Sequence, residues 1–139
     1  MEGKIIEFSY YYKFKKEGIY NIEYIFHNNL TKTNHMFGGC NSLTNLNLSN
    51  FNTQNVTYMN HMFFGCNSLR NLNISNFNTQ NVTDMRNLFS YCNSLINLNL
   101  SNFNTQNVID MRSMFNDCNS LTKNNIITND YKILKEFKI

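Results

Sequence analysis

Apolar residues recur with a fixed period along the central part of this chain. Three consecutive segments of 26 residues, 41–66, 67–92 and 93–118, have nearly the same sequence. Each begins with the pattern Leu-x-x-Leu-x-Leu/Ile, in which the last two apolar residues alternate with asparagines. Alternation with a period of two is typical of a short strand that has one buried face. We therefore predict one strand per repeat, paired in parallel with the next strand at about 4.8 Å.

The second half of each repeat has a wider apolar spacing, which predicts a short helix. Val56, Met59, Met62, Phe63 and Cys66 follow one another at intervals of 3, 3, 1 and 3 residues, and the later repeats keep this spacing. Side chains at these intervals lie on one face of an α-helix. The polar segment before them is rich in Ser, Asn and Thr, which cap helix donors.

Repeats of this length predict a stacked architecture. A unit of this size cannot bury its apolar face alone, and neighbouring units must cover it. The expected fold class is an α/β repeat solenoid, with a parallel sheet on one side and short helices on the other. We expect the solenoid to span residues 30–121 and to contain the three full repeats plus a partial coil at each end.

Both ends of such a stack need a cap, because open ends expose apolar side chains and unpaired strand edges. Apolar and polar residues alternate over 6–14 and again over 20–26, which predicts an N-terminal β-hairpin cap within 1–29. Asn124 stands where the repeats have a core leucine, so we expect the stack to end there. Residues 122–139 are predicted to form the C-terminal cap, with a strand favoured over a short helix for 131–139.

Two inner columns follow from placing equivalent residues of successive repeats above one another. We predict a structural core that contains Cys40, Cys66, Cys92 and Cys118 together with Phe51, Phe77 and Phe103. Free cysteine behaves as a small core residue, so buried thiols are favoured over disulfides. Zinc is disfavoured because no C-x2-C pair exists and the column does not converge on one point. His35 and His61 occupy equivalent positions and are predicted to lie side by side without a metal.

Composition and charge narrow the possible partners. Asparagine makes up about a fifth of the chain, charged residues only 15%, and the net charge is +3. The lysines lie mostly near the two ends, so the repeats have no basic face for nucleic acid. Asp84 and Asp110 fall near the start of the predicted helices, where a negative charge suits the helix dipole. No apolar run is long enough for a transmembrane helix, so membrane insertion is not expected.

The candidate binding surface is the outer face of the predicted strands. An array of amides offers hydrogen-bond donors and acceptors to a partner. The alternative is that the asparagine columns only bond to each other and stiffen the stack. The predicted partner-binding residues are Asn45, Asn47, Asn71, Asn73, Asn97, Asn99 and Arg70. A second candidate surface consists of positions that differ between repeats and lie off the apolar side of the helix: Tyr58, Asp84, Asp110, Asn60, Arg86, Arg112, Phe64, Ser90 and Asn116, with Gly65, Tyr91 and Asp117 beside them.

No pattern in the sequence indicates catalysis or a cofactor. The repeats place no nucleophile beside a base, the aspartates are isolated, and no glycine-rich phosphate loop is present. We therefore expect a protein that is not an enzyme and that needs neither a cofactor nor a metal.

The motifs L-x-x-L-x-L, F-x-T-x-x-V, M-x-x-[ML]-F and C-x-S-L recur in this order over residues 33–121. In this respect the chain resembles the BspA-like leucine-rich repeats, in the 26-residue variant found in mycoplasma-type surface lipoproteins and protist surface proteins. The resemblance implies a right-handed leucine-rich-repeat coil and a role in adhesion or protein contact at the cell surface. The first 18 residues lack a secretion signal, so a chain that is complete as given is expected to stay in the cytoplasm. The localisation is therefore open.

Three functions follow as hypotheses. The first is a binding or adhesion module that presents the asparagine-rich face to a protein or glycan partner. The second is a structural protein whose ends stack into fibres, because a heterologous contact that does not close produces a filament. The third is an ice-binding surface, because Thr53, Thr79 and Thr105 form a regular row of hydroxyls.

Overall fold

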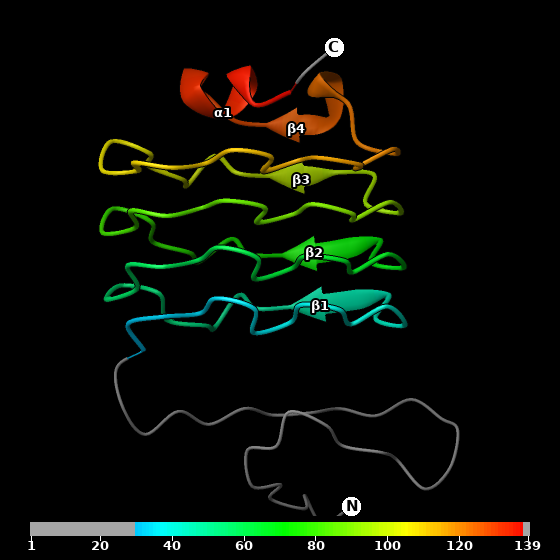
Figure 1. Cartoon of the computed structure of the whole chain (residues 1–139), viewed down its shortest axis with the longest axis horizontal. Helices are drawn as coiled ribbons and strands as arrows, with labels where there is room; N and C mark the ends of the chain where they lie inside the picture. The colour runs from blue at the N-terminus through cyan, green and yellow to red at the C-terminus, as the bar shows by residue number, and fades with distance from the viewer. Residues whose placement is uncertain (1–29, 138–139) are drawn as a thin grey trace, which may run out of the picture.

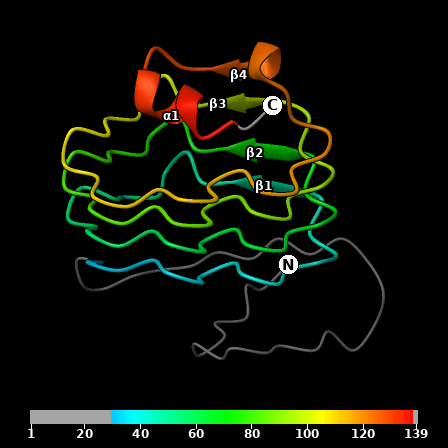
Figure 2. The ribbon, with the colours of Figure 1, turned by 45° about the horizontal axis from the view of Figure 1, so that its top comes forward.

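The computed structural model describes residues 30–137, in which successive repeats lie one above another (Figure 1). The predicted N-terminal hairpin at 1–29 lies outside the described residues. Short strands lie along one side of the stack, and the chain returns along the other side (Figure 2). We call residues 56–66, 82–92 and 108–118 the return segments of the three repeats.

The strands are short and parallel, as the alternating pattern predicts. β1 (Asn45–Asn47) pairs with β2 (Asn71–Asn73), with Leu46 directly opposite Leu72. β3 (Leu98–Asn99) pairs with β4 (Ile126–Ile127). Equivalent positions of neighbouring repeats therefore face each other in the first pair.

The prediction of one continuous sheet is wrong for the described residues. They contain two separate two-stranded sheets, β1-β2 and β3-β4, without a ladder between β2 and β3. The continuity of the stack therefore depends on other contacts between the repeats.

The helix predicted in the second half of each repeat is also wrong. In the return segment of the first repeat, alternate N–H groups bond to the next repeat: Met59 to the oxygen of Asp84 at 2.9 Å and Phe63 to that of Leu88 at 3.0 Å. The N–H groups between them bond three residues back, as Met62 does to Met59 at 3.2 Å. An α-helix would direct these donors four residues back along its own chain.

Left-handed residues divide the return segments into turns. His61 has a φ of 59° and Asn87 at the equivalent position has a φ of 53°, which no right-handed helix allows. A chain of such turns still places residues at intervals of 3, 3, 1 and 3 on the inner side, where Val56, Met59 and Met62 are fully buried. The apolar spacing therefore predicts the buried residues correctly and the backbone conformation incorrectly.

Phenylalanine rings form the longest column in the core. Phe37, Phe63, Phe89 and Phe115 stack with ring centroids 5.8, 5.5 and 5.8 Å apart, nearly parallel to one another. Phe137, from the segment after the last helix, stacks on Phe115 at 4.4 Å. A second column contains Phe51, Phe77 and Phe103, of which Phe51 is only half-buried.

The prediction of free, buried thiols holds for three of the cysteines. Cys66, Cys92 and Cys118 are buried, and each thiol donates a hydrogen bond to the carbonyl of a phenylalanine in the preceding repeat, at 3.1, 3.2 and 2.9 Å. Burial raises the pKa of Cys66 to about 12 and that of Cys118 to about 11, so these thiols stay protonated near neutral pH.

Cys40 is exposed, which contradicts its predicted place in the core. The three buried thiols each bond to a carbonyl of the preceding coil, whereas Cys40 lies in the first coil of the described residues and has no such partner among them.

The stack continues past Asn124, where we expected it to end. The 3-10 helix η1 (Lys123–Asn125) inserts two residues relative to the repeat, so that Ile126 rather than Asn124 lies opposite Leu98. Asn124 is accordingly exposed, whereas Ile126 is buried.

The segment after β4 is a helix, α1 (Tyr131–Lys135), and not the strand we favoured. Asp130 is its N-cap and accepts a hydrogen bond from the N–H of Lys132 at 2.9 Å. Ile133 and Phe137 are four residues apart, so one side of this segment faces the stack: Ile133 is fully buried, and Phe137 extends the ring column. Neither helix in the described range has the length and apolar character needed to cross a bilayer.

We predict that Phe89→Ala destabilises the fold by about 3–5 kcal/mol, because it removes a fully buried ring from the middle of the column. Denaturant unfolding followed by circular dichroism measures the loss. The matched control is Ile109→Ala, whose side chain is 87% exposed and whose removal should cost less than about 0.5 kcal/mol. Similar losses for the two variants would contradict the proposed role of the column.

We predict that the native protein exposes one thiol, Cys40, to an aromatic disulfide reagent at pH 8, and that the other three react only after unfolding. Absorbance at the released-thiol wavelength gives the stoichiometry before and after adding guanidinium chloride. Cys40→Ser should abolish the fast reaction. Rapid reaction of a second thiol in that variant would show that the cysteine column is not closed.

Candidate functional site

The strand face presents an ordered row of asparagine side chains. Asn47, Asn73 and Asn99 are exposed, and their side-chain oxygens accept the N–H of Ser49, Ser75 and Ser101 at 3.1, 3.1 and 3.0 Å. This local bond fixes the orientation of each amide. Among the described residues, the amide nitrogens of these asparagines have no hydrogen-bond partner. The face therefore carries a row of fixed, unused donors.

The neighbouring asparagine column is partly used within the stack. The side-chain nitrogen of Asn71 donates a hydrogen bond to the side-chain oxygen of Asn45. The side-chain nitrogen of Asn45 in turn donates to the hydroxyl of Thr44 at 2.9 Å. For this pair the alternative hypothesis holds, since the amides bond to each other. Asn97 and Arg70 are exposed on the same face, and Ile96 beside them is 48% exposed.

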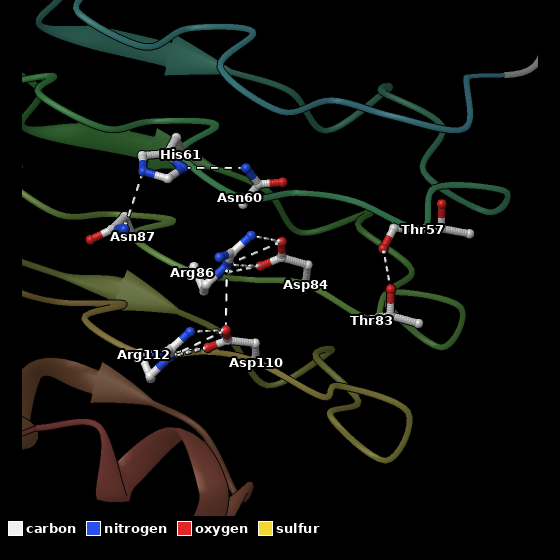
Figure 3. A network of polar contacts seen from close by, with 9 residues as sticks. All are labelled: Thr57, Asn60, His61, Thr83, Asp84, Arg86, Asn87, Asp110 and Arg112. Atoms are coloured by element: carbon white, nitrogen blue, oxygen red, sulfur yellow. Dashed lines mark hydrogen bonds and ion pairs between the residues drawn. The ribbon is translucent and has the colours of Figure 1, made fainter.

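A second parallel array lies on the return segments, half a repeat away from the strands. Tyr58, Asp84 and Asp110 form successive parallel bridges, which begin at Lys32. Asp84 accepts from the guanidinium of Arg86 at 2.8 Å, and Arg86 also lies 3.4 Å from Asp110 (Figure 3).

Asp110 pairs with Arg112 at 2.7 Å, which completes a chain of alternating charges across the second and third repeats. We call Asp84, Arg86, Asp110 and Arg112 the acid-arginine ladder. The hydrogen bond from the Arg112 side chain is the main cause that lowers the pKa of Asp110, against an opposing effect of burial. The pairing with Arg112 therefore favours the ionised form of the Asp110 carboxylate.

The expected position of Asp84 at an exposed helix start is wrong. Its side chain is largely buried under Arg86, and its oxygen accepts the backbone N–H of Arg86 at 3.0 Å. The aspartate therefore fixes a turn and an ion pair and does not interact with a helix dipole.

The histidine pair is present as predicted. The rings of His35 and His61 stack with centroids 4.5 Å apart and an interplanar angle of 13°. The ring nitrogens of His61 face the side-chain amides of Asn60 at 3.3 Å and Asn87 at 3.1 Å (Figure 3). Burial, then the nearby His35, lower the pKa of His61. Within residues 30–137 no three His, Cys, Asp or Glu side chains converge into a possible metal site.

The threonine row is not a surface, which overturns the basis of the ice-binding hypothesis. Thr53, Thr79 and Thr105 are buried, with exposed fractions of 1, 1 and 2%. The hydroxyl of Thr53 donates to the carbonyl of Asn78 at 2.9 Å and accepts its N–H at 2.8 Å. These hydroxyls connect the repeats and are not available to solvent.

Asp130 provides the hydrogen-bond partners of Thr105, the last threonine of the row, which in the earlier repeats come from the backbone of the next repeat. Its carboxylate accepts the Thr105 hydroxyl at 2.6 Å and the Thr105 N–H at 3.2 Å, while it caps α1. Burial alone would raise the pKa of Asp130, but the hydrogen bonds from Thr105, Lys132 and Ile133 lower it overall. One carboxylate thus joins the C-terminal helix to the last repeat.

Two surface hollows were not predicted from the sequence. One, of about 230 Å³, is lined by Lys32, Asn34, Tyr58, Asn60, Asp84 and Arg86. The other, of about 330 Å³, lies beside the C-terminal helix and is lined by Ser101, Phe103, Asn104, Asn129 and Asp130. The sequence does carry a signal for the first hollow, because Tyr58 and Asn60 replace the Asp and Arg of the later repeats.

Comparison with known proteins gives one family. The model of the family described as "Mycoplasma protein of unknown function, DUF285" matches residues 7–131. The comparisons with curated proteins and with solved structures yield no match.

We predict that Asp130→Asn destabilises the protein by about 1–2 kcal/mol at pH 7, because the amide loses the charge that strengthens the bonds from Thr105. The folded pKa of Asp130 lies below its ordinary value of 3.8, so its stabilising effect is complete above that pH and is lost as the pH falls through the folded pKa. Thermal unfolding of both proteins from pH 7 to pH 2 should show the difference shrinking below about pH 4. Asp117→Asn, at an exposed turn, is the matched control and should change little at any pH. A difference between wild type and Asp130→Asn that persists unchanged at pH 2 would contradict this assignment.

Proposed function

Because the chain belongs to the mycoplasma protein family that matches residues 7–131, whose description names no activity, we propose from its geometry that it is a non-enzymatic binding module with a role in adhesion. The strand face is the proposed contact surface, and its partner is a protein or a glycan. The observation that supports this most directly is the row of oriented amide donors on Asn47, Asn73 and Asn99.

The proposed surface is preorganised. Each of these amides is already fixed by its bond to a serine N–H, so a partner does not have to order it on binding. Loss of side-chain freedom normally costs about 0.5–1.5 kcal/mol for each immobilised side chain at an interface. A fixed row of amides therefore favours recognition of a partner that has acceptors at the spacing of the repeats.

We further propose that the repeat stack is a solenoid of the BspA-like leucine-rich-repeat type. The parallel pairing of equivalent strand residues and the regular phenylalanine column support this proposal. The short strands on one side agree with it, whereas the return segments consist of turns and not of the helices expected for such a coil.

The chemistry of the described residues adds no support for an enzyme. Asp84 and Asp110 are held by arginines, and Asp130 by Thr105 and Lys132. The buried thiols of Cys66 and Cys118 have raised pKa values, which makes them poor nucleophiles.

Fibre formation is the less favoured function. Phe137 covers the exposed end of the ring column, and Asp130 occupies the positions where a further repeat would bond to Thr105. A chain that stacks end to end would have to displace this C-terminal cap. The cap therefore disfavours fibre growth from the C-terminal end.

We predict that replacing Asn47, Asn73 and Asn99 with alanine weakens adhesion of protein-coated beads to cultured animal cells by about tenfold or more, because three oriented donors are lost together. Bead retention under flow is the measurement. Asn73→Asp provides a second test: its carboxylate still accepts the Ser75 N–H, so the turn is kept while the central donor is removed.

The matched control replaces Gln54, Gln80 and Gln106, three exposed amides away from the strand face, with alanine. This control should retain adhesion. If the folded asparagine variants adhere as well as the wild type, the strand face is not the contact surface.

A further inference from the structure

The hollow around Tyr58 lies on the first two return segments and on the partial coil before them, and it is separate from the strand face. The Tyr58 side chain is 42% exposed, and the ammonium group of Lys32 lies over its ring, 5.4 Å from the centroid. Asn34 lines the hollow from the partial coil before the first repeat, and Asn60 lines it from the first repeat. Asp84 and Arg86 line it from the second repeat. Figure 3 shows Asn60 and the Asp84-Arg86 pair on neighbouring levels of the stack.

The repeats themselves show that the fold does not need these side chains. At the positions of Tyr58 and Asn60, the second repeat has Asp84 and Arg86, and the third has Asp110 and Arg112. Those residues form the acid-arginine ladder, which stabilises the return segments. In the first repeat the backbone bonds between repeats remain, such as Thr33 N–H to the oxygen of Tyr58 at 2.9 Å, but the ion pair is replaced by an aromatic ring and an amide.

The replacement of the Asp and Arg by Tyr58 and Asn60 in the first repeat leaves several polar groups around the hollow without a partner among the described residues. Within the described residues Lys32 has no carboxylate partner, and Arg86 uses Nε and Nη2 on aspartates, which leaves Nη1. The Asn34 amide has no hydrogen-bond partner there, and Asn60 uses only its amide nitrogen, on His61. The Asp84 and Arg86 charges offset each other, so Lys32 gives the hollow a net charge of +1.

We propose that this hollow binds an acidic sugar residue of the hexuronate class. The Lys32 ammonium lies over the Tyr58 ring in the free protein, and we expect it to move off the ring to pair with the carboxylate of the sugar. This movement opens the ring as a platform for the apolar face of the pyranose. Asn34, Asn60 and the free Arg86 nitrogen supply donors and an acceptor for the hydroxyls. The volume of about 230 Å³ lies below the range of about 300–1,000 Å³ that is common for larger ligands, and it suits a single ring.

Free phosphate is a poorer match for the same hollow. Strong phosphate sites use clusters of free backbone N–H groups. Here the N–H groups of Met59, His61 and Phe63 are bonded to the next repeat. The aromatic platform would also have no role in binding a simple anion.

The test measures binding of sodium D-glucuronate and of D-glucose to the full chain by ligand-observed saturation-transfer NMR, at low ionic strength. We expect saturable binding of glucuronate with a Kd in the millimolar range and binding of glucose at least about tenfold weaker, because glucose lacks the carboxylate that pairs with Lys32. Lys32→Met should reduce glucuronate binding to the level of glucose.

The decisive variant is the double substitution Tyr58→Asp and Asn60→Arg, which copies the sequence of the second repeat and should fold with a longer acid-arginine ladder. Loss of glucuronate binding in this folded variant supports the proposal. Binding that persists in it, equal binding of glucose, displacement of glucuronate by equimolar inorganic phosphate, or no saturation by the wild type would each overturn it.

This inference does not depend on the strand face. Asn73→Asp lies on the other side of the stack and should leave glucuronate binding unchanged. Failure of the adhesion experiment and failure of the sugar-binding experiment are thus separate results.

Discussion

The constraint on which the rest of the structure depends is that backbone groups of one repeat must bond to the next. The N–H groups of Met59, His61, Phe63 and Gly65 all donate to carbonyls of the second repeat at 2.8–3.0 Å. The equivalent groups of the second repeat bond in turn to the third, as Met85 does to Asp110 at 2.8 Å. A buried backbone donor must be satisfied somewhere. Because these donors are satisfied by a neighbour and not within a helix, each repeat requires another repeat beside it.

This backbone register places identical side chains above one another, and the core follows from it. Rings at Phe63 and Phe89 stack at 5.5 Å because the repeats advance by about one strand spacing. The same register lets the thiol of Cys92 reach the carbonyl of Phe63 and the hydroxyl of Thr79 reach that of Asn104. Side-chain contacts of this kind thus connect neighbouring repeats where no strand ladder does, including between the repeats that contain β2 and β3. The end of the stack needs substitutes for these contacts, and Asp130 and Phe137 provide them.

The sequence predicts the register and the buried columns well because both depend only on the identity of equivalent positions. It does not predict the conformation of the return segments, since the spacing of Met59, Met62 and Cys66 is the same on a helix and on a chain of turns. The burial of Thr53 is likewise hidden, because its partner lies 25 residues away. Ile126 replaces Asn124 only because η1 adds two residues, a local event that the repeat pattern does not encode. The alternating pattern correctly predicts that the strand face is exposed, whereas the Tyr58 hollow forms between residues of three neighbouring coils and is not predicted by the pattern of any one repeat.

Since the backbone bonds are largely used between repeats, recognition by this protein falls to side chains that the stack does not need. The repeats provide an internal comparison for finding them. Asp84 and Asp110 share one structural role, so the replacement of that residue by Tyr58 in the first repeat gives up an ion pair at this position without breaking the backbone ladder. A repeat stack can therefore change the exposed side chains of one repeat while the backbone bonds between repeats stay the same. Each such change gives that repeat its own binding groups.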